Sequence, residues 1–182
     1  GDEIDEKRLC NIIKDMHLIH GCTQIVLDHV TYLVDGKDNQ LVLMQKIMGD
    51  LNRINKKFPF TLHYISHLRK ATNGEASHEE GGRVRIDDFV GGKAIVQYSH
   101  LIFGLEGNRQ AEDEQERLYT TIRLLKNRLF GYNAGKTTML RYNIERGQKY
   151  QMTVEEIEKE MTRRAIHKKL LKTKKKAAGD GF

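Results

Sequence analysis

The chain has 182 residues, the size of one ordinary domain or of a piece of a larger one. Lys and Arg number 31 against 25 Asp and Glu, which gives a net charge of +6, and 38% of the residues are hydrophobic. The longest apolar stretches fall far short of the ~20 residues that cross a bilayer, so we expect no membrane-spanning segment. Apolar runs recur along residues 1–150, which excludes a chain that is disordered throughout.

Two cysteines, Cys10 and Cys22, make no disulfide framework. No signal peptide precedes them, and we therefore expect a cytoplasmic protein. The chain opens with Gly1 rather than Met, which indicates a fragment or a processed product.

The first part of the chain is predicted to alternate helices and strands. Residues 3–19 place apolar side chains at the three- and four-residue spacing of one helix face. Residues 24–28 form a short apolar run, which is typical of a strand buried on both faces of a parallel sheet. A loop at 35–39 leads into a second amphipathic helix at 41–54. A second strand is predicted at 61–66.

The second part begins with a polar loop at 69–87, and a loop of this length is usually functional or disordered. A capping box at 153–156 opens a last helix, with Ile157, Met161 and Ala165 on its apolar face. Between the polar loop and this capping box, the sequence predicts a helix at 91–99, a strand at 101–105, a charged loop at 107–116, a strand at 119–125 and a β-hairpin at 137–151.

This order of elements predicts an α/β fold, with a mostly parallel sheet flanked by helices, a C-terminal β-hairpin and a terminal helix. Because the chain enters through a helix with no strand before it, we expect the start of the sheet to lie upstream. We expect residues 1–150 to form the sheet-containing part and residues 151–182 to form a helical basic tail. The stretch 167–176 is the most basic. It either binds nucleic acid through phosphates or is a solvated terminus, and the sequence leaves both open.

Two predicted strands end in residues that suit a ligand site. Asp28 follows the first strand, where an α/β sheet binds ligands and where nucleotide hydrolases hold magnesium. The alternative is an Asp that caps the next turn. His67 follows the second strand and either senses a phosphate or is an ordinary hydrogen-bonded histidine. His63 precedes it by four residues, but on a strand the two lie ~13 Å apart, which argues against a zinc site.

A later strand ends in Lys126 and Arg128. Two residues apart on an extended chain, they project to the same side, and the Arg fork suits a phosphate. The alternative is an exposed basic strand end. Residues 131–137 resemble a phosphate-binding loop, but three residues rather than four separate the first Gly from the Gly-Lys pair, and a strand-like segment follows. We therefore expect a turn at that position.

Taken in order, these motifs resemble the motor domain of DnaB-type hexameric replicative helicases, in particular the helicase half of phage primase–helicases and their mitochondrial relative Twinkle. The resemblance covers residues 21–150. The matching segments are 21–29 (Walker B), 65–69 (the motif with the His), 77–88 (the end of the DNA-facing loop), 91–97 (the next helix, with Gln97), 105–106 (the strand after it) and 125–147 (the arginine-finger strand and terminal hairpin).

The resemblance implies a RecA-like fold, of which this chain supplies the carboxyl-terminal part of the core. It also implies an ATP-dependent DNA helicase that unwinds duplex DNA while it moves along single-stranded DNA as a hexameric ring. The implied cofactors are ATP, or another NTP, and Mg²⁺. The implied partners are single-stranded DNA, further copies of the chain, primase and DNA polymerase, in the host cytoplasm if the protein is phage-encoded.

The roles implied for single residues divide between the nucleotide and the DNA. Asp28 positions Mg²⁺, and His67 couples the γ-phosphate to the DNA loops. Arg128, with Lys126, reaches into the site of the neighbouring subunit, and Gln97 belongs to the motif of the preceding helix. The residues expected to follow the backbone of single-stranded DNA are Lys37, Arg69 and Lys70.

The family's Walker A loop and catalytic glutamate lie upstream of Walker B, and no segment of this sequence matches either. We therefore expect the chain by itself not to hydrolyse ATP. The alternatives are a non-catalytic fragment that binds single-stranded nucleic acid and a RecA-like recombinase.

Overall fold

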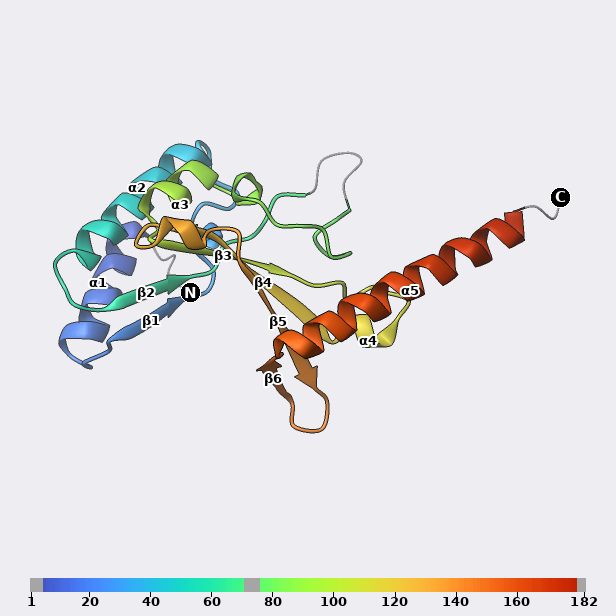
Figure 1. Cartoon of the computed structure of the whole chain (residues 1–182). Helices are drawn as coiled ribbons and strands as arrows, with labels where there is room; N and C mark the ends of the chain where they lie inside the picture. The colour runs from blue at the N-terminus through green and yellow to red at the C-terminus, as the bar shows by residue number, and fades with distance from the viewer. Residues whose placement is uncertain (1–4, 71–75, 180–182) are drawn as a thin grey trace.

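The computed structural model of the chain describes residues 5–70 and 76–179, so residues 71–75 of the predicted polar loop lie outside the described residues. A parallel pair of strands, β1 and β2, packs against two helices, α1 and α2 (Figure 1). Their bounds are α1 Glu6–Leu18, β1 Gln24–Leu27, α2 Gln40–Asn55 and β2 Thr61–Tyr64.

The two helices follow the predicted periodicity. Asp5 caps α1, because its side chain accepts a hydrogen bond from the backbone N–H of Arg8 at 2.7 Å. The buried side chains of α2 recur every three or four residues and form one apolar face, while Leu41 at its start is 65% exposed. The buried members of this face are Met44, Ile47, Met48, Leu51 and Ile54.

The second sheet is antiparallel and follows the order β3-β4-β5-β6. A loop that contains the short 3-10 turn Gly131–Asn133 joins β4 to β5, and a tight turn joins β5 to β6; chain reversals of this kind produce antiparallel pairs. A second core cluster, formed by Val84, Phe89, Ile95 and Ile102, lies between α3, β3 and the preceding loop. The bounds are α3 Gly92–Tyr98, β3 Leu101–Glu106, α4 Glu114–Arg117, β4 Tyr119–Asn127, β5 Thr137–Asn143 and β6 Gln148–Gln151.

The α/β class is confirmed, but the balance of strand pairing differs from the expected mostly parallel sheet. Among the described residues, only β1 and β2 pair in parallel, and the larger sheet is antiparallel. The expectation that β1 is buried on both faces is also wrong. Ile25 is buried, but the side chain of Val26 is 65% exposed, so one face of the strand is open.

Gly91 lies at the start of α3, where this helix meets α2. Its φ is +77°, a left-handed conformation that favours glycine. A Cβ atom at this position would lie 2.6 Å from Cγ of Met44, which is fully buried in α2. The absence of a side chain therefore allows α3 to begin directly against the buried face of α2.

The last helix, α5 (Val154–Gly179), projects from the second sheet away from the rest of the chain (Figure 1). Its predicted capping box is confirmed, because the Thr153 hydroxyl accepts from the N–H of Glu156 and the Glu156 carboxylate accepts from the N–H of Thr153. The predicted apolar face is wrong beyond Ile157. Met161 is 63% exposed, and Glu160 is buried in its place at 5% exposure.

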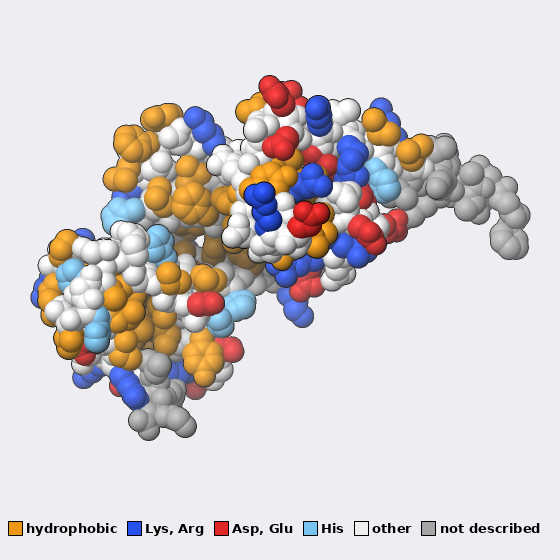
Figure 2. Space-filling model, turned by 90° about the horizontal axis from the view of Figure 1, so that it is seen from below, with side chains coloured by type: hydrophobic (Ala, Val, Ile, Leu, Met, Phe, Trp, Pro, Cys, Tyr) orange, Lys and Arg blue, Asp and Glu red, His pale blue; other side chains and the backbone are white. Residues whose placement is uncertain are grey.

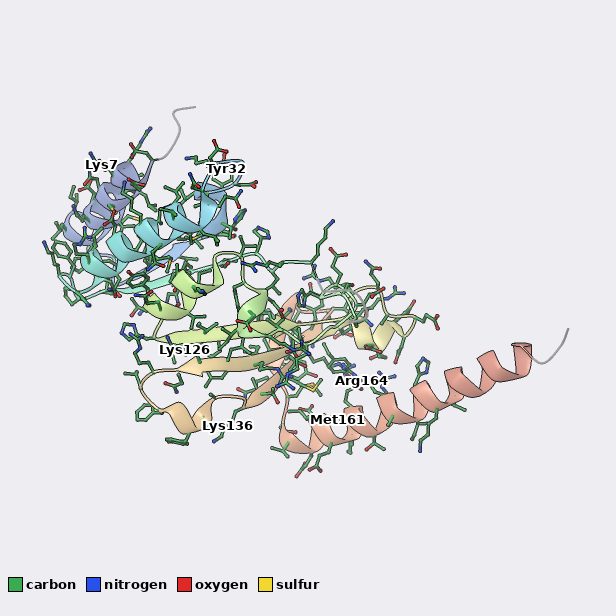
Figure 3. All side chains as sticks on the ribbon, turned by 90° about the horizontal axis from the view of Figure 1, so that it is seen from above. Lys7, Tyr32, Lys126, Lys136, Met161 and Arg164 are labelled. Atoms are coloured by element: carbon green, nitrogen blue, oxygen red, sulfur yellow. The ribbon has the colours of Figure 1, made fainter. Side chains whose placement is uncertain are left out.

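Charged side chains mingle where α5 leaves the body (Figure 2). Arg163 and Arg164 both donate hydrogen bonds to Glu160, and Arg163 also pairs with Asp113, the N-cap of α4. Arg164 lies on the side of α5 that faces the sheet (Figure 3), with its guanidinium 4.9 Å from the ring centroid of Tyr119. The helix is thus attached through Arg163 on Asp113, Arg164 on the Tyr119 ring, and Ile157 against the cluster that contains Tyr119.

Two expectations lie at the edge of what the structure describes. The basic stretch 167–176 has a helical backbone, but the side chains of Lys168 and of residues 171–182 lie outside the described part. The division of the chain at residue 150 stays a prediction. In the described ranges, no helix is both long and apolar enough to cross a membrane.

Candidate functional site

The carboxyl ends of β1 and β2 form one edge, at which Asp28 and His67 both lie. The parallel pairing continues past the strands, because the N–H of Ile65 donates to Leu27 O at 3.0 Å and the N–H of Val30 donates to Ile65 O at 2.8 Å. The chain therefore leaves both strands at the same place. Asp28 and His67 are exposed, so ligands can reach both side chains.

His29 joins the two residues at this edge, although sequence reasoning did not single it out. Its ring lies against the ring of His67, with 4.0 Å between centroids and an interplanar angle of 90°. The only sequence signal was its place directly after Asp28 in the Walker B-like segment. The edge thus presents one carboxylate and two imidazoles in one place.

The expected magnesium ion can be tested against these residues. Mg²⁺ is usually bound by one or two carboxylates together with water and substrate phosphates, rather than by an all-protein cage. The exposed carboxylate of Asp28 fits that donor set. Within residues 5–70 and 76–179, no group of three or more His, Cys, Asp or Glu could hold a metal ion. Asp28 therefore fits as one ligand of a site that a nucleotide would complete.

A second group gathers at the carboxyl end of α3. Nζ of Lys126 donates to the carbonyl of Val96, and Nη2 of Arg128 donates to the carbonyl of Gln97 at 2.8 Å. Both cations thus point to the same side, as their spacing predicts. The end of a helix carries partial negative charge, which favours cations there. Burial lowers the pKa of Lys126, and the charge of Arg128 lowers it further.

Gln97 is itself held from α2. Nε2 of Gln45 donates to Oε1 of Gln97 at 3.0 Å and to the hydroxyl of Tyr98 at 3.3 Å. Gln97, Lys126 and Arg128 therefore form one cluster, although α3 and the end of β4 are well separated in the sequence.

The two groups lie apart within one chain. Tyr32, which follows His29 by three residues, is far from Lys126 in Figure 3. Asp28 and His67 belong to the edge of the parallel pair, whereas Lys126 ends a strand of the antiparallel sheet. A single chain therefore presents Asp28 and His67 on one surface and Arg128 on another.

The residues expected to contact DNA lie in different loops. Lys37 is half-buried between β1 and α2, and Lys70 is exposed after β2. Arg69 lines a groove of about 900 Å³ between α2 and α3. The backbone N–H of Arg69 donates to Asp88 O at 2.6 Å, which fixes the start of the polar loop.

Two sequence patterns have structural explanations. The Gly-rich segment at 131–137 is a turn that leads into β5, as expected, because the N–H of Gly135 donates to Leu124 O at 2.7 Å. His63 lies in β2, and its Nε2 contacts Oε1 of Gln24 on β1 at 2.6 Å.

Comparison with known proteins supports the resemblance of the chain to replicative helicases. No model of a protein family matches the chain. The chain is 33% identical over 147 residues to the DNA helicase/primase of Enterobacteria phage T3, which covers 80% of this chain and 25% of that protein. The solved structure of a helicase ATPase domain has a similar fold, with a TM-score of 0.62, 14% identity and coverage of 82% of this chain and 52% of that chain. The chain thus spans a quarter of the first protein and about half of the second. In sequence and in its RecA-like fold, the chain is similar to a part of DnaB-type helicases.

Proposed function

We propose that this chain is part of an ATP-dependent replicative DNA helicase, which unwinds duplex DNA while it moves along single-stranded DNA as a hexameric ring. The main support is that the groups needed for phosphoryl transfer lie on two separate surfaces of one chain. Such an arrangement is useful only when neighbouring copies bring the two surfaces together. The matched region of a phage helicase/primase supports the same conclusion.

At the edge of β1 and β2, Asp28 binds the Mg²⁺ of the nucleotide, and His67 contacts the terminal phosphate and reports its presence to the DNA-facing loops. Bound Mg·ATP supplies the transferable phosphoryl group and neutralises much of its charge. His67 suits its role because its backbone is tied to the end of the polar loop, where the N–H of Val90 donates to His67 O at 3.1 Å.

At the other surface, Arg128 acts as a finger on the nucleotide of the neighbouring subunit. One of its five N–H groups is used by the Gln97 carbonyl, and the exposed side chain leaves the rest of the fork for phosphate oxygens. Lys126 holds the end of α3, on which Arg128 rests. Fingers of this kind contribute ~10³–10⁵ in rate in well-studied phosphoryl-transfer enzymes.

Lys37, Arg69 and Lys70 contact the phosphates of single-stranded DNA in the central channel. Primase and DNA polymerase are the expected partners, in the cytoplasm of a phage-infected cell. ATP is the nucleotide of this proposal, and the chain supplies only part of its site.

The trans position of Arg128 gives the test. In the complete protein, Arg128→Ala should abolish most DNA-stimulated ATP hydrolysis while nucleotide binding and ring assembly stay nearly intact. Arg146→Ala, which removes an exposed arginine from the turn between β5 and β6, is the matched control. Rings mixed from Arg128→Ala subunits and subunits without the Walker A lysine should partly recover hydrolysis, because some interfaces then pair an intact site with an intact finger.

No recovery at any mixing ratio, in rings shown to contain both subunits, would refute a finger that acts in trans. Full activity of Arg128→Ala would refute any role of this residue in hydrolysis.

A further inference from the structure

We propose that His29 is a positioning residue, which fixes the orientation of the His67 ring at the edge of β1 and β2. The contact between the two rings is a property of this chain. Its consequence for ATP hydrolysis rests on the function proposed for His67.

The ring of His29 is held from one side. Its Nδ1 accepts a hydrogen bond from the N–H of Tyr32 at 3.1 Å and lies 2.7 Å from Oγ1 of Thr31. Because a backbone N–H can only donate, Nδ1 must be the acceptor, and a neutral His29 carries its proton on Nε2. Thr31 is 6% exposed and Val30 is fully buried, so the anchor itself cannot move freely.

The ring of His67 is held less firmly than its main chain. The main chain is fixed, since the N–H of Val90 donates to His67 O and Leu68 forms a β-bridge with Phe89. The side chain, however, is exposed, and an exposed side chain ordinarily samples several rotamers. The His29 ring at 4.0 Å and 90° favours the rotamer in which the two rings meet edge to face.

A fixed ring matters for a residue that must meet a phosphate. Ordering a side chain on binding costs free energy, and that cost falls when the side chain is already held in the productive position. An edge-to-face ring pair changes such an equilibrium about 2- to 10-fold. We therefore expect removal of the His29 ring to weaken the action of His67 by that factor.

Two substitutions separate the ring contact from the hydrogen bond. In His29→Asn, the side-chain oxygen takes the place of Nδ1 and can still accept from Tyr32, but the ring is gone. In His29→Phe, the ring remains and the acceptor is gone. His63→Asn is the matched control, because His63 is a histidine of the same strand pair whose side chain contacts Gln24, at the start of β1, and not His67.

The first measurement is NMR of the His67 ring in the 182-residue chain. His29→Asn should move the His67 ring resonances toward those of a freely rotating histidine and leave the amide resonances of 30–34 nearly unchanged. His29→Phe should retain a ring-current shift on His67, and His63→Asn should leave the His67 ring resonances in place. His67 resonances that are unchanged in His29→Asn would overturn the proposal.

The second measurement is DNA-stimulated ATP hydrolysis by the complete protein. His29→Asn should lower kcat about 2- to 10-fold with little change in KM for ATP, and His29→Phe should restore most of it. His67→Ala should lose most of the activity. If His67→Ala is fully active, the function proposed for His67 fails. If His67→Ala is inactive and His29→Asn is fully active, the proposed function stands and the positioning role fails.

Discussion

One buried carboxylate, Glu160, holds the two arginines through which α5 contacts Asp113 and Tyr119, and this gives a prediction about the attachment of the helix. Glu160 is 5% exposed and accepts three hydrogen bonds of 2.8 Å, two from Arg163 and one from Arg164. Arg163 also pairs with Asp113 and so connects the helix to the segment before β4. We consider Glu160→Gln, which keeps the shape of the side chain and removes its charge.

The expected loss follows from the burial of each partner. Removing one member of a fully buried ion pair costs ~3–5 kcal/mol. Here the side chains of Arg163 and Arg164 are 37% and 31% exposed, so water compensates for part of the lost attraction. Arg163 also keeps Asp113. The pairs of Glu160 with Arg163 and Arg164 lie within α5 and persist when the helix detaches, so only the burial of Glu160 and the placing of the two arginines contribute to the attachment. We therefore expect the free energy that holds α5 to the sheet to fall by about 1 kcal/mol, a ~5-fold change in the equilibrium between attached and detached helix.

Hydrogen exchange of the 182-residue chain measures this equilibrium, because amides of the first turns of α5 exchange when the helix detaches. Glu160→Gln should speed their exchange by about that factor. Glu158→Gln, on the same helix but exposed, is the control and should change the free energy by less than ~0.5 kcal/mol. Equal effects of the two substitutions would refute the assignment of the attachment to Glu160.

The same network makes the attachment sensitive to acid. Burial alone would raise the pKa of Glu160, but hydrogen bonds from Arg163 and Arg164 outweigh it and lower the pKa below its usual value of 4.5. A carboxyl whose folded-state pKa is lowered stabilises the fold above its usual pKa, and this contribution is lost as the pH falls through the lowered value. The difference in the free energy of attachment between the unaltered chain and Glu160→Gln should therefore be largest near pH 7 and shrink below about pH 4. A difference that is independent of pH would contradict the charge-based explanation.

Three further predictions concern the proposed function. The purified 182-residue chain should not hydrolyse ATP in a phosphate-release assay, and turnover above background that Asp28→Asn leaves unchanged would contradict our account of what the site lacks. In the complete protein, Arg128→Lys should restore little of the hydrolysis lost in Arg128→Ala, because lysine lacks the planar fork; full rescue would show that only the charge matters. Deleting residues 167–182 should flatten the salt dependence of DNA binding by close to one unit of slope per lost phosphate contact, whereas an unchanged slope would make the tail a passive terminus.

Periodicity and end signals in the sequence predicted the elements well. The spacing of apolar residues located α1 and α2, and the capping box at Thr153 located the start of α5. The same reasoning placed Asp28 and His67 at strand ends. Because both strands are parallel neighbours, that placement already implied that the two residues share an edge.

Features that depend on distant partners were not predictable from local patterns. An acid such as Glu160 in a charged helix ordinarily faces solvent, and here it is buried because Asp113 and Tyr119, far away in the sequence, complete its surroundings. An apolar run cannot show which side of a strand its neighbours cover, so the exposure of Val26 was missed. The contact between His29 and His67 follows from the pairing of two strands and has no periodic signal of its own.

Gly91 has a consequence for how distant relatives of this chain should be compared. Any other residue there would have to adopt a left-handed backbone, at a cost of ~1–2 kcal/mol, and displace the buried Met44. The glycine is thus required for α2 and α3 to fold against each other, whatever ligand the protein binds. A descendant that had lost its catalytic activity would keep Gly91 for as long as it folded, while the identity of residue 28 or 128 would be free to drift. A relative that shares this glycine therefore shares the packing of α2 against α3, and the glycine by itself says nothing about activity.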